Sequence, residues 1–123
     1  MKRTLRLFAG IIVLSLCLTA PVLAEFHRLV SIVGGSGQQL STALATAGYA
    51  GPVQLDELII CNPTGSANTI YLGNSSAVNA STGFPIVAGN CERWRAAGRN
   101  IDASSYFIFS ATTQSIAVSL RPR

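Results

Sequence analysis

Turn-forming clusters of Gly, Pro, Asn and Ser divide the chain from residue 53 onward into short β-rich runs. The clusters recur about every 8–12 residues, a spacing typical of β-sandwiches and barrels. These runs do not alternate with helix-length amphipathic segments, which disfavours a parallel α/β sheet. The runs expected to be strands, one of them upstream of residue 53, are 29–33, 53–61, 69–72, 84–87, 91–95, 106–109 and 116–120. We therefore expect an all-β domain, a small antiparallel β-sandwich or barrel of about six or seven short strands.

Residues 25–52 form a less regular segment ahead of this domain. The apolar run at 29–33 is expected to be the first strand, and the sequence GGSG at 34–37 is a loop signal. Residues 38–48 fit either a short helix or an extended arm, because Ser, Thr and Gly interrupt the helical pattern. The expected organisation is an N-terminal arm or first strand over 25–52, followed by a β-sandwich domain over 53–123.

The first 24 residues have the three parts of a cleavable secretory signal. A basic start with Lys2 and Arg3 leads into an apolar run over residues 7–18. A small-residue end at Ala24, of the kind that signal peptidases cut, follows the helix breaker Pro21. We interpret this segment as a signal helix that is removed on export. The alternative is an uncleaved membrane anchor.

Removing this segment changes the charge of the protein. The whole chain has nine Lys and Arg against five Asp and Glu, a net charge of +4. Three of the nine cations, Lys2, Arg3 and Arg6, lie in the signal, so six arginines and five acids leave the remainder near +1. Nucleic-acid-binding domains are typically strongly basic, and we therefore expect no nucleic-acid partner.

Cys61 and Cys91 are the two cysteines outside the signal, since the third, Cys17, lies within it. An even pair in an exported chain predicts a disulfide, and one pair allows one connectivity. The alternative is a metal site. His27 is the only histidine, and together with two cysteines it supplies too few ligands for zinc, so we expect no metal.

The sequence shows none of the catalytic motifs that depend on local spacing, such as a G-x-S-x-G elbow or a P-loop. His27 lies close to the expected new N-terminus, where a loose backbone would not orient a general base. Asp56 and Glu57 are adjacent, so on a regular strand they face opposite ways, and we interpret them as the solvated edge of a strand. The GGSG sequence at 34–37 lacks the lysine of a phosphate-binding loop. We expect neither an enzyme nor a cofactor.

Arg93-Trp94-Arg95, with Arg99 nearby, is the most distinctive cluster of side chains. Trp and Arg are enriched at binding hot spots, so we predict that these four residues form an interface. On a strand Trp94 points away from Arg93 and Arg95, and the alternative is a Trp94 in the core. An inward Trp94 would direct Cys91 outward, so the disulfide would cross the sheet surface unless a bulge intervenes.

Four stretches of the expected sandwich follow one another in a distinctive series. A strand that ends in Asn-Pro at 62–63 is followed by an Ile-Tyr-Leu-Gly strand at 70–73. A Ser-Thr-Gly-Phe-Pro loop at 81–85 and an aromatic strand at 106–109 complete the series, which covers about residues 53–120. This series resembles small β-sandwich modules of bacteriophage and prophage structural proteins. The resemblance implies a virion-associated sandwich that decorates a particle surface or forms part of a fibre.

These features predict an exported, non-enzymatic structural or binding module, located in the periplasm, outside the cell or on a virion surface. The leading expectation is a virion-type surface or assembly protein whose partner is a protein surface or another copy of itself. The alternative is a secreted or periplasmic carbohydrate- or surface-binding sandwich that uses Trp94, Tyr71 and Tyr106. An exposed aromatic platform would favour sugar binding, and a flat self-complementary face would favour assembly. Membrane contact is expected only if residues 7–24 are retained.

The mature protein should begin at Glu25, because Val22 and Ala24 satisfy the small-residue rule for that cut. Intact-mass measurement on protein recovered from an export-competent host will identify the cut, and a cut after Ala20 is the second possibility. A full-length species that stays in the membrane fraction would contradict removal of the signal and make residues 7–24 an anchor.

Overall fold

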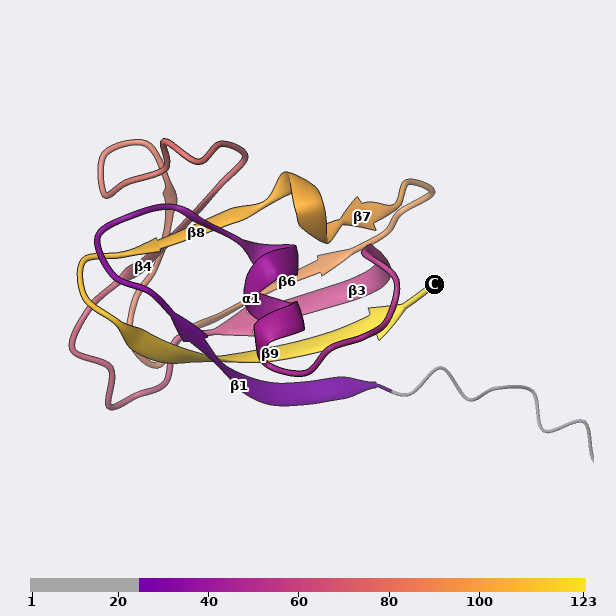
Figure 1. Ribbon diagram of the computed structural model, residues 1–123, viewed down its shortest axis with the longest axis horizontal. Coiled ribbons are helices and arrows are strands. Elements are labelled where there is room, and N and C mark those ends of the chain that lie inside the picture. Colours follow the sequence, from indigo (N-terminus) through magenta and orange to yellow (C-terminus); the bar gives the residue numbers. More distant parts are fainter. Residues whose placement is uncertain (1–24) are drawn as a thin grey trace, which may run out of the picture.

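Two antiparallel sheets make up most of the computed structural model, which describes residues 25–123 (Figure 1). This part of the chain contains nine strands, one α-helix and one 3-10 helix, so the all-β prediction is confirmed. The signal helix expected over residues 1–24 lies outside the described residues. Neither helix within residues 25–123 has the length and apolar character needed to cross a membrane.

The larger sheet has the strand order β1–β9–β3–β6, and β7 pairs with the start of β3. Its strands are β1 (Phe26–Ile32), β3 (Gln54–Cys61), β6 (Cys91–Arg95), β7 (Ile101–Asp102) and β9 (Gln114–Pro122). β9 pairs with β1 on one side and with β3 on the other, so it lies at the centre of the sheet. β1 and β6 are therefore the edge strands, and β6 has β3 as its single neighbour.

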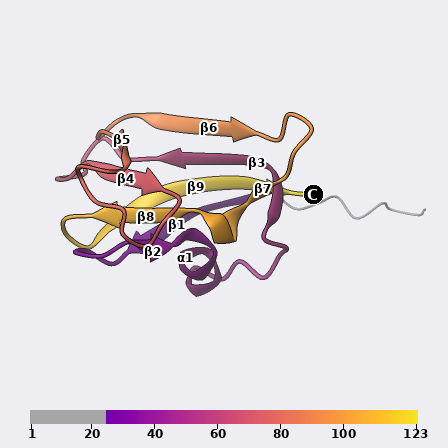
Figure 2. The ribbon, with the colours of Figure 1, turned by 90° about the horizontal axis from the view of Figure 1, so that it is seen from above.

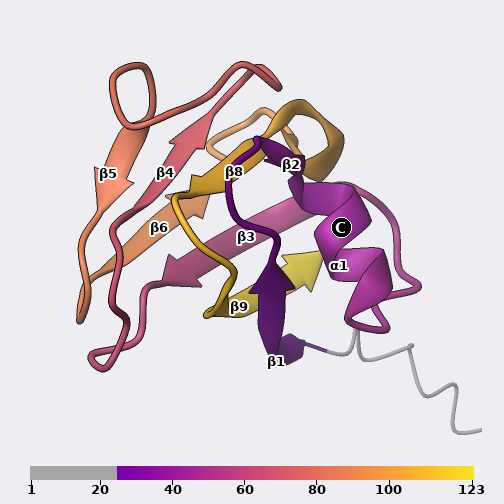
Figure 3. The same cartoon turned by 60° about the vertical axis from the view of Figure 1, so that its left-hand side comes forward.

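The smaller sheet has the strand order β2–β8–β4–β5. Its strands are β2 (Gln38–Gln39), β4 (Ile70–Gly73), β5 (Phe84–Ile86) and β8 (Phe107–Ser110), and the helices are α1 (Leu40–Thr46) and the 3-10 helix η1 (Ala103–Ser105). Figure 2 looks onto both sheets, with β6 and β5 at one margin and β1, β2 and α1 at the other. Figure 3 likewise shows β5 and α1 on opposite sides of the molecule.

The inner faces of the two sheets and the apolar side of α1 enclose one core. Ile116, Val118 and Leu120 of β9 are at most 2% exposed, as the alternating pattern of that strand predicts. They pack with buried side chains of β1, α1, β3, β4, β5 and β8, which are Val30, Ile32, Leu40, Ala43, Leu44, Leu55, Leu58, Ile60, Ile70, Leu72, Ile86 and Ile108. Below, the face of each sheet that lines this core is called the inner face, and the opposite face the outer face.

The N-terminal segment contributes to the same core as the rest of the domain. β1 begins at Phe26 rather than Leu29 because it pairs with β9 along its whole length, so the expectation of a loose backbone around His27 is wrong. Within residues 38–48 the helical alternative is the one observed, as α1. The first residue of α1, Leu40, is fully buried and donates its backbone N–H to Tyr106 O at 2.9 Å. Tertiary packing therefore stabilises this short helix.

Asn62 joins the end of β3 to the smaller sheet. Its side chain is 1% exposed, and Nδ2 donates to the backbone oxygens of Asn68 and Ile86, at 2.9 Å each. Asn68 lies just before β4 and Ile86 ends β5, so one amide holds two strands of the smaller sheet. The backbone of Asn62 also exchanges hydrogen bonds with Gly89 and Asn90, which turn the chain into β6. The two sheets are thus fastened together at the corner where β3 ends.

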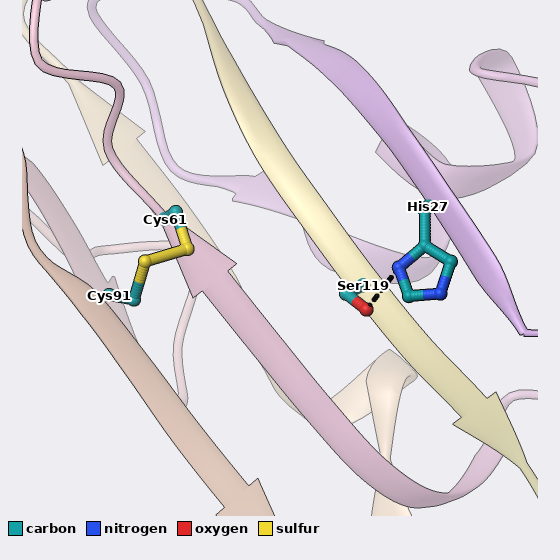
Figure 4. The surroundings of a disulfide bond; sticks show 4 residues. All are labelled: His27, Cys61, Cys91 and Ser119. Atoms are coloured by element: carbon teal, nitrogen blue, oxygen red, sulfur yellow. Dashed lines mark hydrogen bonds between the residues drawn. A yellow bond between two sulfur atoms is a disulfide. The ribbon is translucent and has the colours of Figure 1, made fainter.

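Cys61 and Cys91 lie directly opposite each other on β3 and β6 and form a disulfide, with their Cα atoms 4.0 Å apart (Figure 4). The pairing of β6 with β3 is regular from Glu57–Arg95 to Cys61–Cys91. Trp94 pairs with the buried Leu58 and therefore faces inward, which directs Cys91 outward. The disulfide crosses the outer surface of the sheet without a bulge.

Replacing both cysteines by alanine should lower the free energy of unfolding by about 3.5 kcal/mol, because the bond closes a loop of about 30 residues in the unfolded chain. Urea unfolding followed by tryptophan fluorescence measures the change. The reduced wild-type protein serves as a control and should unfold at the same urea concentration as the double variant. A double variant as stable as the oxidised wild type would contradict this prediction.

Candidate functional site

The alternation of side chains along β6 divides the predicted Arg-Trp-Arg interface between two faces. Arg93 and Arg95 are exposed on the outer face, next to the disulfide. Trp94 is partly buried on the inner face, where it packs against the core. Arg99 is exposed in the turn between β6 and β7. The structure therefore does not bring these four side chains onto one continuous surface.

A cleft opens at the margin where the inner faces of β5 and β6 diverge. Its volume is about 560 Å³. Three aromatic side chains from different segments line it: Phe84 at the start of β5, Trp94 on β6, and Tyr106 just before β8. Phe84 is 53% exposed, while Trp94 and Tyr106 are partly buried and pack against the core. The remaining lining residues are Leu72, Gly73, Asn74, Thr82 and Glu92.

The loop of residues 74–83 borders this cleft with two of its residues, Asn74 and Thr82. Val78 is 5% exposed beneath the loop, and a Cβ on Gly73 would lie 2.7 Å from its Cγ2 atom, so the chain needs glycine where β4 ends. Asn79 donates its backbone N–H to Thr82 Oγ1 at 3.1 Å, and Thr82 donates its own to Asn79 O at 3.3 Å. These contacts position Thr82, and Asn74 follows Gly73 directly. Both Asn74 and Thr82 are exposed and line the cleft.

Glu92 is the one charged residue among the described residues that line the cleft. It pairs with Ile60 in the strand ladder and so shares the inner face with Trp94. Within residues 25–123 its carboxylate has no hydrogen-bond or ion-pair partner in the structure. The cleft thus combines three aromatic rings, the polar groups of Asn74 and Thr82, and one unpaired negative charge.

The outer face of the larger sheet carries a separate charged cluster centred on Glu57. Its carboxylate, on a side chain that is 14% exposed, accepts hydrogen bonds from Arg93 and, at 3.2 Å, from Arg95 Nε. Arg121 lies opposite on β9. The hydrogen bond from Arg93, followed by that from Arg95, lowers the pKa of Glu57 below its ordinary value. The prediction that Asp56 and Glu57 form a solvated strand edge is wrong, because β3 is a central strand with a register shift between residues 55 and 57.

His27 also lies on the outer face, between a serine and a carboxylate. Its Nδ1 is 2.5 Å from Ser119 Oγ on the neighbouring strand (Figure 4). Its Nε2 is 3.1 Å from Glu25 Oε2. This is the order of groups in a serine nucleophile relay. The side chains of His27 and Glu25 are both 60% exposed, however, and β9 is paired on both sides, so its backbone N–H groups serve the ladders instead of an oxyanion hole. We interpret the three residues as a surface hydrogen-bond chain.

Sequence reasoning named two of the three aromatic residues of the cleft, Trp94 and Tyr106. The third aromatic residue expected for sugar binding, Tyr71, lies opposite Phe109 on the outer face of the smaller sheet, with the ring centroids 6.2 Å apart. Glu92 was missed, although its separation from Trp94 by two residues puts both on one strand face. Phe84 has no local signal that relates it to Trp94, because β5 and β6 belong to different sheets.

Comparison with protein-family models, with curated proteins and with solved structures finds no match for this chain. The resemblance to phage structural modules stays a prediction. Among residues 25–123 there is also no group of three or more His, Cys, Asp or Glu side chains placed to hold a metal ion. The function is therefore inferred from the side chains of the cleft and of the outer face.

The lowered pKa of Glu57 predicts a loss of stability in acid. Its carboxylate contributes stability above the pKa of the unfolded chain, about 4.3, and this contribution is lost as the pH falls through the lower folded pKa. Urea unfolding at a series of pH values should show the wild type losing its advantage over Glu57→Gln across this window. The Arg93→Ala, Arg95→Ala variant is the matched control and should show little additional effect of Glu57→Gln. A difference between wild type and Glu57→Gln that is constant with pH would contradict the prediction.

Proposed function

We propose that the protein is an exported, non-enzymatic binding module and that the cleft between β5 and β6 binds a carbohydrate. The observation that carries this proposal is the convergence of Phe84, Trp94 and Tyr106 from three segments onto one cleft. Sugar rings have apolar faces that stack on aromatic side chains, and equatorial hydroxyls that need polar partners. Among the lining residues, Asn74 offers such a partner, and the Thr82 hydroxyl, which accepts from Asn79 N–H, can still donate its own hydrogen.

The dimensions of the cleft support a small, specific ligand. Its volume of about 560 Å³ lies within the range of about 300–1,000 Å³ that is usual for ligand pockets. Leu72 closes its floor and belongs to the core, so a ligand would rest on a surface that the fold already holds in place. Pre-organisation of this kind reduces the entropy lost on binding. Of the two roles expected from the sequence, the cleft thus favours carbohydrate binding.

An oxidising location supports the exported part of the proposal. The Cys61–Cys91 disulfide joins β3 and β6 on the outer face of the larger sheet, away from the core. Disulfides persist in secreted, periplasmic and virion-surface proteins and are rare in reducing cytosol. Together with the signal sequence expected over residues 1–24, this bond favours export to the periplasm, the extracellular space or a particle surface.

The edge strand β1 supports a second candidate, a virion-type surface or assembly protein. Leu29 is 66% exposed on the outer face of β1, and Val33, just beyond the end of this strand, is 55% exposed. A strand edge with exposed apolar side chains can pair with a strand of another chain. In Figure 2, β1 lies at the margin opposite to β5 and β6, whose residues line the cleft, so assembly through β1 would not occlude the cleft.

Phe84→Ala should weaken oligosaccharide binding by about tenfold, the loss expected for an aromatic residue at a binding hot spot. Phe84 is preferred to Trp94 for this test because it is largely exposed, so its removal leaves the core intact. Isothermal titration against a panel of neutral and charged oligosaccharides measures the effect. Leu29→Ala is the matched control, since it removes an apolar side chain that is 66% exposed, against 53% for Phe84, from the outer face. Binding that survives Phe84→Ala but is lost in Leu29→Ala would place the site on the outer face.

A further inference from the structure

We propose that the carbohydrate bound in the cleft is an amino sugar with a free ammonium group, and that Glu92 selects it. This inference rests on the proposed function and identifies the chemical class of the ligand. Its starting point is the carboxylate of Glu92, which has no partner within residues 25–123 and lies beside three aromatic rings; none of the described residues that line the cleft is an arginine or a lysine. A partly buried carboxylate without a counter-ion favours a cation as its partner.

Side chains alternate between the two faces of β6, so Glu92 lies on the opposite face from Arg93 and Arg95, the basic residues nearest to it in sequence. Arg93 and Arg95 lie on the outer face, where both are hydrogen-bonded to Glu57. Lysine is absent from residues 25–123, so this part of the chain offers no lysine ammonium as a partner for Glu92. Arg123, at the end of the chain, donates to Asn100 in the turn between β6 and β7. The negative charge of Glu92 is therefore available to a ligand.

The aromatic residues of the cleft act in the same direction as Glu92. The faces of aromatic rings carry negative potential and attract cations, most strongly in the case of Trp. Trp94 and Glu92 lie two residues apart on the same face of β6, so a ring stacked on Trp94 can present an amino group to the carboxylate. An N-acetylated sugar would keep the stacking but lose the charge, and a uronic acid would be repelled.

The proposal predicts an order of affinity for matched oligosaccharides. Glucosamine tetramers with free amines should bind at least about tenfold more tightly than N-acetylglucosamine tetramers, a factor usual for one charge-assisted contact. Galacturonate tetramers should bind least. Choline tests whether a cation without a sugar ring is sufficient, and we expect binding at least about tenfold weaker than that of the glucosamine tetramer, because it cannot stack and hydrogen-bond as a ring does.

Glu92→Gln provides the decisive variant, because it keeps the shape of the side chain and removes its charge. Titration calorimetry with the whole exported protein should show that the Glu92→Gln variant no longer prefers tetramers with free amines. The variant should keep its affinity for N-acetylglucosamine tetramers within about twofold of the wild type. Glu57→Gln removes the same charge from the outer face and should leave both affinities unchanged. Circular dichroism of each variant confirms that the sheets are intact.

The outcomes separate the inference from the proposed function. The role of Glu92 would be overturned if the wild type bound the glucosamine and N-acetylglucosamine tetramers with equal affinity. It would also be overturned if Glu92→Gln kept the preference for the glucosamine tetramer. In both cases carbohydrate binding itself would stand. Choline that binds as tightly as the glucosamine tetramer would overturn the requirement for a sugar. If none of the oligosaccharides binds to the wild type, both the inference and the proposed function are wrong.

Discussion

The register of β6 on β3 is the constraint on which both faces of the molecule depend, and the Cys61–Cys91 disulfide fixes it. An edge strand with a single neighbour can slip, and a slip of one residue exchanges the side chains of its two faces. Here it would place Trp94 in solvent and an arginine against the core. Because the bond joins directly opposed residues at one end of the pairing, it excludes such a slip and keeps Glu92 and Trp94 in the cleft.

The same corner of the fold also positions the opposite wall of the cleft. Asn62 follows Cys61 directly, and its buried amide holds the end of β5 through Ile86 O at 2.9 Å. Phe84 lies two residues before Ile86 on this short strand. Its position relative to Trp94 therefore depends on the hydrogen bond from Asn62 and on the disulfide of Cys61, the last residue of β3. A cleft between two separate sheets needs such a joint, since no strand pairing connects β5 with β6.

Local patterns were sufficient to predict seven of the nine strands, but not the two-residue strands β2 and β7 or the cleft. Alternation located β9, and turn clusters located β3, β4 and β6, because these signals depend on residues close in sequence. The directions of the β6 side chains likewise followed from the sequence: if Trp94 faces inward, alternation directs Cys91 outward. The start of β1 was missed because its first residues form a strand only by pairing with β9, which lies about 90 residues away in the sequence. Glu57 was misjudged for a related reason: its strand is central, and the arginines that surround it come from β6 and β9.

The two edges of the larger sheet differ in a way that separates their roles. β6 presents Arg93 and Arg95, and charged side chains on an edge strand oppose pairing with another chain. β1 presents Leu29, which is exposed and apolar, at the opposite margin. The arginines therefore disfavour contact with a second chain beside the cleft, and β1 is the edge through which we propose assembly. Copies joined through β1 would keep their clefts open, so assembly on a surface would multiply the proposed carbohydrate-binding sites without obstructing them.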